Sequence, residues 1–160
     1  MESLISRMEF LLVSTINALE NLPEEELLFK PSPDKWSKKE ILGHLIDSAI
    51  NNLQRFTEIT FEEKPYKLRT YRQDELVKAN NYQKAALPDL VMLWFFLNNR
   101  IISLIKNQSA STLQFQVIIG NNEIKTLDWL IRDYVAHLEH HLKQFDFKQQ
   151  ENSQKARYSL

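Results

Sequence analysis

The sequence predicts an all-α fold, a bundle of four long helices with a short β-hairpin before the last helix. Apolar residues recur at intervals of three and four along four segments, which is the spacing of one helix face. The chain of 160 residues contains only two glycines, Gly43 and Gly120, and therefore few of the turn residues that a strand-rich fold needs. Its length is that of one domain able to bury a sizeable core.

The first two helices have recognisable ends. Apolar side chains at helical spacing run from about residue 4 to residue 22, and Pro23 closes this first helix. The loop that follows ends at a capping box, in which the side chain of Ser37 accepts a hydrogen bond from the backbone N–H of Glu40 and the glutamate reaches back. The second helix begins there, and His44 lies at the border of its apolar stripe.

Residues 61–72 are polar and basic, with tyrosines among the lysines and arginines. One short cluster of this kind in a near-neutral protein is more typical of a solvated loop than of a nucleic-acid site. We therefore expect a loop that covers an anionic small molecule, followed by a short helix over residues 73–80.

The third helix is expected from about Pro88, which suits a first helical position, to Lys106. Its residues 90–97 are apolar all round the helix, yet this run is too short to span a bilayer. A helix in a four-helix bundle has one side away from the core, so an apolar surface on every side predicts contact with a second subunit. The pattern favours a homodimer through this helix, and the alternative is that flanking loops cover its outer side.

The last part of the chain combines a hairpin, a helix and a tail. Residues 113–125 alternate weakly between apolar and polar and turn at residues 120–122, which predicts a small hairpin at one end of the bundle. Thr126 is a suitable N-cap for the last helix, whose apolar pattern continues to Phe145. No apolar pattern follows, so we expect a bundle domain over residues 1–147 and a disordered tail over residues 148–160.

Composition argues against several classes of function. The formal net charge of −1 and the ordinary charged fraction of 26% imply neither nucleic acid nor a membrane surface as partner. Without cysteine, the chain has no disulfide, no thiolate metal ligand and no cysteine nucleophile. The first residues lack the pattern of a secretory signal, and no apolar run approaches the roughly 20 residues that span a bilayer. We expect a cytoplasmic protein.

Three of the four histidines lie close together near the end of the last helix. His137 and His141 are one turn apart on the same face, so their imidazoles can share one metal ion. A divalent metal with an open position needs at least three protein ligands, and the remaining candidate is His44 in the second helix. A metal site therefore exists only if the two helices meet face to face. If they do not meet, these histidines are structural or surface groups. Within a metal site the rival ligand is His140, which projects about a quarter-turn away from the face of His137 and His141.

Two carboxylates lie next to these histidines in the sequence. Asp47, one turn after His44, is a candidate to orient that imidazole or to accept a proton, and the alternative is an exposed helical aspartate. Glu139 is expected to point away from His137 and to face solvent.

Several of these motifs together resemble the DinB/YfiT-like superfamily over nearly the whole chain. The resemblance rests on Trp36-Ser37 opening a helix, the run from Gly43 to Ser48, the run Tyr71-Arg72-Gln73-Asp74, and the runs from Thr126 to Leu130 and from Tyr134 to His141. It implies a four-helix bundle of unusual connectivity, commonly a homodimer, in which His44, His137 and His141 hold a divalent metal.

The resemblance also implies a range of functions. Some members of the family are metal-dependent hydrolases, others transfer a low-molecular-weight thiol such as bacillithiol or mycothiol to an electrophile, and others have no known activity. We therefore expect a divalent metal such as zinc or nickel, a small-molecule substrate and, for thiol transfer, a low-molecular-weight thiol as co-substrate. The alternatives are a metal-binding or stress-associated bundle protein without turnover, and a helical interaction module that uses the apolar third helix.

Overall fold

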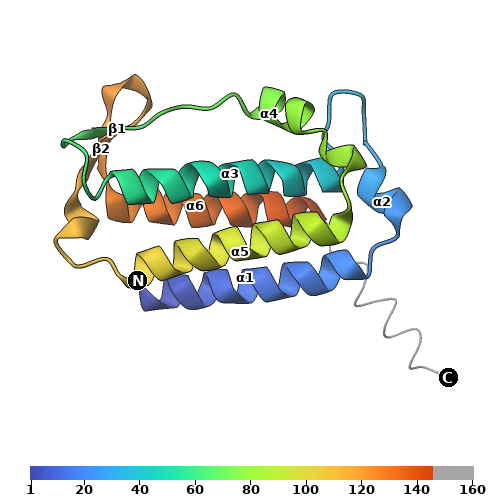
Figure 1. Cartoon of the computed structure of the whole chain (residues 1–160), viewed down its shortest axis with the longest axis horizontal. Helices are drawn as coiled ribbons and strands as arrows, with labels where there is room; N and C mark the ends of the chain where they lie inside the picture. The colour runs from blue at the N-terminus through green and yellow to red at the C-terminus, as the bar shows by residue number, and fades with distance from the viewer. Residues whose placement is uncertain (146–160) are drawn as a thin grey trace.

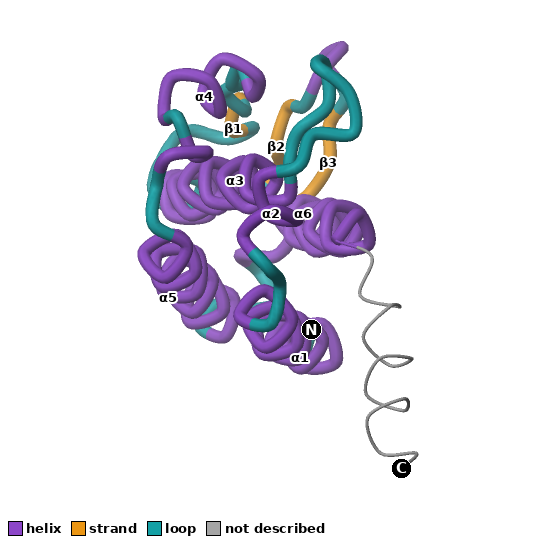
Figure 2. Tube along the Cα trace, turned by 90° about the vertical axis from the view of Figure 1, so that its right-hand side faces the viewer, coloured by secondary structure: helices purple, strands orange, loops and turns teal. Residues whose placement is uncertain are grey.

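Four long helices form a bundle in the computed structural model, which describes residues 1–145 (Figure 1). The long helices are α1 (Glu2–Glu20), α3 (Lys38–Glu58), α5 (Leu87–Lys106) and α6 (Leu127–Leu142). Each packs against two others, in the order α1, α5, α3, α6 around the bundle (Figure 2). Because α1 and α3 lie across a diagonal, the connectivity is not that of a simple up-and-down bundle. The predicted tail, residues 148–160, lies outside the described residues.

The helix ends follow the signals in the sequence. Ser37 Oγ accepts a hydrogen bond from the N–H of Glu40 at 3.2 Å, and a carboxylate oxygen of Glu40 accepts one from the N–H of Ser37 at 2.8 Å. The predicted capping box is therefore present at the start of α3. Thr126 caps α6 in the same way, since its Oγ1 accepts a hydrogen bond from the N–H of Trp129 at 3.2 Å. The short helix α4 (Gln73–Asn80) has the predicted bounds.

One short helix, α2 (Glu24–Leu28), lies where the sequence predicts only a loop. Pro23 occupies its N-cap, and three glutamates fill its first turn, where negative charge is favourable. These signals were present in the sequence, but a single turn between prolines leaves too few residues for an apolar periodicity to appear.

The apolar stripes of the four helices meet in one core. Trp94 of α5 and Phe56 of α3 are fully buried, and each buried side chain of this size contributes roughly 1.5–3 kcal/mol of apolar burial. Smaller core residues from three helices fill the space between them: Met8, Leu12, Leu42, Leu45, Ile101 and Ile105.

A small sheet covers one end of the bundle, with strands β1 (Tyr66–Lys67), β2 (Gln116–Ile118) and β3 (Ile124–Thr126) in that order. β2 and β3 form the predicted antiparallel hairpin. β1 was not expected, and it pairs with β2 in parallel, Tyr66 opposite Val117. This pairing ties the polar segment after α3 to the hairpin that leads into α6.

Part of the surface of α5 and α3 is apolar and exposed. Met92 and Phe96 of α5 are 57% and 60% exposed, and Leu93 of α5 and Ile50 of α3 are also exposed. Beside them a groove of about 370 Å³ runs between the two helices, lined by Ile50, Leu53, Gln54, Thr57, Glu58 and Leu97. Within residues 1–145 no loop covers these side chains, so the alternative of flanking loops is wrong for this part of the chain. The homodimer stays a prediction.

By length and composition α5 would also qualify as a membrane span, the one described helix that does so, with a mean hydropathy of 1.2. The expectation that no apolar run approaches the length of a membrane span is therefore wrong for α5. Ile101 and Ile102 continue the apolar character of this helix beyond residue 97. α5 packs on α1 and α3. The core helix of a soluble bundle commonly meets the same criterion.

Candidate metal centre

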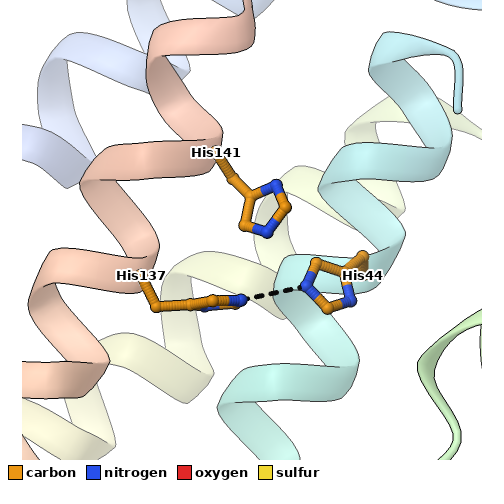
Figure 3. A group of neighbouring side chains, drawn as sticks. All are labelled: His44, His137 and His141. Carbon is orange, nitrogen blue, oxygen red and sulfur yellow. Dashed lines mark hydrogen bonds between the residues drawn. The ribbon is translucent and has the colours of Figure 1, made fainter. Parts of the chain in front are cut away.

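His44, His137 and His141 converge between α3 and α6, as Figure 3 shows. One ring nitrogen from each lies within 4.8 Å of the other two. Nε2 of His44 and Nε2 of His137 are 3.1 Å apart, and the ring centroids of the three imidazoles are 4.6 to 5.1 Å from one another. The meeting of the two helices that the sequence required is therefore found in the structure.

The local sequence explains why these rings meet. The capping box sets the start of α3, so His44 falls in its second turn, and the Thr126 cap sets the phase of α6. α3 begins at the end of the bundle where α6 ends (Figure 1), so an early residue of α3 faces late residues of α6. His44 is completely buried and not at the border of the apolar stripe, because α6 packs over it.

All three imidazoles are held in the neutral form that a metal ligand needs. Burial, and then the proximity of the other two rings, lowers the pKa of His44 to about 3. Burial, followed by the neighbouring His141 and His140, lowers the pKa of His137 to about 4. The pKa of His141 is also lowered, chiefly by burial. At neutral pH each ring therefore has one unprotonated nitrogen, the form that binds a metal.

The donor set fits a divalent transition metal. Two nitrogen ligands at about 2.0–2.1 Å from a tetrahedral zinc ion are about 3.3 Å apart, close to the 3.1 Å between His44 and His137. Three imidazole nitrogens without thiolate suit zinc, nickel, copper, iron or cobalt. His140 is exposed and outside this group, with its ring edge-on to His141 at 5.2 Å.

Within residues 1–145 Asp47 makes no hydrogen bond that would orient His44, and its expected role as a proton acceptor stays a prediction. It is buried, not an exposed helical aspartate, and its Oδ1 accepts hydrogen bonds from the Tyr82 hydroxyl at 2.7 Å and from Asn80 Nδ2 at 2.9 Å. Among the described residues its other oxygen has no hydrogen-bond partner, so no such bond orients His44. Burial raises the pKa of this carboxyl, although the bonds from Tyr82 and Asn80 oppose the shift. Asp47 thus fastens the end of α4 and the turn that follows it onto α3.

Glu139 was expected to face solvent and is instead partly buried in an ion pair with Arg7, 2.7 Å away on α1. This contact joins α1 to α6 and lies outside the group of three histidines.

Sequence reasoning missed the contact between Trp36 and the triad. The Trp36 ring lies 4.7 Å from that of His44, tilted by 34°, and 6.3 Å from that of His141. In the sequence Trp36 is marked only by its position directly before the capping box. That position predicts where α3 starts, but it does not predict which side chains the indole contacts.

A cavity of about 550 Å³ adjoins the triad, and His141 is the triad residue that lines it. This volume suits a small-molecule ligand. Apolar residues and charges of both signs make up the lining: Phe29, Pro31, Trp36 and Ile41, with Lys35, Lys38, Glu26, Asp34, Asp74 and Gln144. None of residues 61–72, the loop expected over a substrate, contributes to it.

Comparison with known sequences gives a family match and a relative. The model of the DinB superfamily matches residues 9–145. A presumed metal-dependent hydrolase of Halalkalibacterium halodurans is 30% identical over 134 residues, which are 82% of this chain and 76% of that protein.

Solved structures with the same fold agree with the bundle topology. YfiT from Bacillus subtilis, described as a probable metal-dependent hydrolase with an unusual four-helix bundle topology, has a TM-score of 0.83 at 21% identity and covers 94% of this chain and 87% of its own. Two structures of a mycothiol-dependent maleylpyruvate isomerase give TM-scores of 0.69 and 0.67 at 11% and 13% identity. They cover 88% of this chain, which spans 58% of their length. At these identities the likeness concerns the fold.

Proposed function

The chain belongs to the DinB superfamily, and from this premise we propose that it is a metal-dependent enzyme acting on a small molecule. Hydrolysis is the reaction we favour, because the relative at 30% identity is named for metal-dependent hydrolysis. The observation that carries the proposal is the convergence of three neutral imidazoles beside a cavity of substrate size.

The residues of this chain have separate tasks in such a site. His44, His137 and His141 would hold the ion, and their neutral state at pH 7 lets them do so without releasing protons. A divalent ion with open positions would supply Lewis-acid chemistry, lowering the pKa of a bound water to about 7 or ionising a bound thiol. Trp36 and Ile41 give the cavity an apolar wall beside His141.

The cavity favours an enzyme over a closed structural site. A structural metal site is fully coordinated and covered, whereas a catalytic one keeps open positions that a substrate can reach. Here His141 both belongs to the triad and lines the cavity, so the space for a ligand begins at the candidate metal site. A metal-binding bundle protein without turnover would have no need of this access.

Thiol transfer is the second candidate, because the fold neighbours include a mycothiol-dependent isomerase. The chain has no cysteine, so the reacting sulfur would have to come from a low-molecular-weight thiol. The same cavity would then hold the thiol and the electrophile together, with the thiol sulfur next to His141.

Metal content and an activity screen test the proposal together. Purified protein should carry about one divalent ion per chain, and His44→Ala and His137→Ala should lose most of it. His140→Ala, an adjacent histidine outside the triad, is the matched control and should keep the ion. Esterase, amidase and thiol-conjugation substrates then identify the reaction. Equally little metal in the wild type and both triad variants would end the metalloenzyme proposal.

A further inference from the structure

We infer that Trp36 is the positioning residue of the candidate metal site, with its indole setting the plane of the His44 ring in place of the usual hydrogen bond. This inference rests on the proposed function, since it concerns the residues that would hold the ion. Trp36 would thus belong to the metal site although it is not one of the three histidines.

The hydrogen bonds that normally orient metal-binding imidazoles are missing here. A ligand histidine usually donates its second ring N–H to a carboxylate or a carbonyl, which fixes the ring. Nδ1 of His44 and Nδ1 of His141 are both buried, and neither has a hydrogen-bond partner among the described residues. The nearby carboxylate Asp47 accepts hydrogen bonds from Tyr82 and Asn80 through Oδ1, and its Oδ2 makes no hydrogen bond to His44 among the described residues. Ring packing must therefore supply the orientation.

Trp36 has the geometry for this task. Its ring centroid is 4.7 Å from that of His44 at an angle of 34°, close enough for direct contact between the two π faces. It is also 6.3 Å from His141, so a single indole flanks ligands from both helices. A change in the plane of the His44 ring would therefore alter its contact with the indole.

The indole is itself held by the signal that starts the helix. Trp36 directly precedes the N-cap Ser37, and Ile41 is the fourth residue of α3, so the two occupy the positions of a hydrophobic staple. Both line the cavity beside the triad. The capping box that starts α3 thus also fixes the residue that orients His44 two turns later.

Trp36 is also placed to contact a ligand in the cavity. Its indole lines the cavity and also touches His44, so a ligand in the cavity would meet the residue that holds the metal-binding ring. An apolar or aromatic part of a substrate can stack there, and stacked aromatic rings prefer centroid distances of about 4.5–7 Å.

Zinc affinity in two Trp36 variants tests the inference. Trp36→Phe keeps an aromatic face and should bind zinc within about threefold of the wild type, whereas Trp36→Leu should bind about 10–100-fold more weakly, the usual loss for an outer partner of a metal ligand. Affinity is measured by competition with a chromophoric chelator. Trp129→Leu removes a half-buried tryptophan at the other end of α6 and should leave the affinity unchanged.

A second readout separates orientation from folding. The visible absorption of bound cobalt reports ligand geometry, and it should be altered in Trp36→Leu and native in Trp36→Phe. If circular dichroism shows Trp36→Leu to be unfolded, Trp36→Met replaces it, since methionine keeps apolar bulk without a ring, and the same criterion applies. Native zinc affinity and a native cobalt spectrum in the aliphatic variant would refute the inference while the metal site stands. A wild type that binds no zinc would refute the proposed function instead.

Discussion

The contact between Gly43 and Tyr82 allows a stability prediction that intrinsic helix propensity contradicts. Gly43 lies inside α3, where alanine would ordinarily stabilise the helix by about 1 kcal/mol. However, a Cβ at this position would overlap three ring atoms of Tyr82, the farthest only 2.6 Å away. Tyr82 is buried and donates its hydroxyl hydrogen bond to Asp47 at 2.7 Å. The ring therefore cannot move away without breaking that bond.

The expected magnitude follows from these contacts. Forcing an extra carbon into a packed contact costs about 1–3 kcal/mol, and losing a hydrogen bond to a charged group costs about 1.5–3 kcal/mol. Subtracting the gain in helix propensity of about 1 kcal/mol, Gly43→Ala should lower the free energy of unfolding by about 1.5–5 kcal/mol. The free energy of unfolding of a typical domain is about 5–15 kcal/mol in total, so this loss is large.

Urea unfolding of two glycine variants provides the assay. Gly120→Ala is the matched control, because its added Cβ meets nothing within 4 Å and Gly120 does not have a positive φ. It should change stability by less than about 0.5 kcal/mol. In a Tyr82→Ala background the Gly43→Ala change should become neutral or stabilising, since the clash is removed. Stabilisation by Gly43→Ala in the intact protein would refute the argument.

Two further predictions concern pH and assembly. Metal-free protein should lose stability as pH falls through about 6.5, because the unfolded chain then binds protons that folded His44 and His137, with pKa values of about 3 and 4, do not. Between pH 7.5 and pH 5.5 the free energy of unfolding should fall by about 2 kcal/mol, a value that discounts the partial exposure of His137. Urea titrations at the two pH values measure this loss, which should be smaller in His44→Gln. An equal stability at both pH values, or an equal loss in the variant, would contradict the prediction. The exposed apolar face carries two projecting side chains, Met92 and Phe96, beside a groove lined by Ile50, Leu53 and Leu97. In a twofold dimer the projecting side chains of each subunit would pack into the groove of the other. Sedimentation should show a dimer at micromolar concentration that Phe96→Glu separates into monomers, and a monomeric wild type would exclude it.

Local signals in the sequence were enough to predict most of the fold. The capping box at Ser37, the cap at Thr126 and the bounds of α4 all depend on residues within one or two helical turns. The hairpin before α6 was also predictable, because its two strands are joined by a short turn. The family resemblance adds the bundle topology, which is confirmed by the helix packing and by the likeness to the four-helix bundle of YfiT.

The features that could not be predicted depend on contacts between distant segments. β1 consists of two residues whose partner strand lies about fifty positions later, so no local pattern reveals it. Asp47 looked like a helical aspartate beside His44, and only the return of Tyr82 and Asn80 to α3 buries it. The depth of His44 was underestimated for the same reason, since α6 covers what a helical wheel shows as the edge of a stripe.

We propose that three imidazoles contributed by α3 and α6 hold one divalent ion. X-ray absorption at the zinc edge of zinc-loaded protein tests this proposal most directly, because imidazole rings give a characteristic scattering pattern beyond the first shell. We expect three histidine nitrogens at about 2.0–2.1 Å together with one or two oxygen donors, and one fewer imidazole in His44→Ala. A spectrum without imidazole scattering, or one unchanged in His44→Ala, would contradict it.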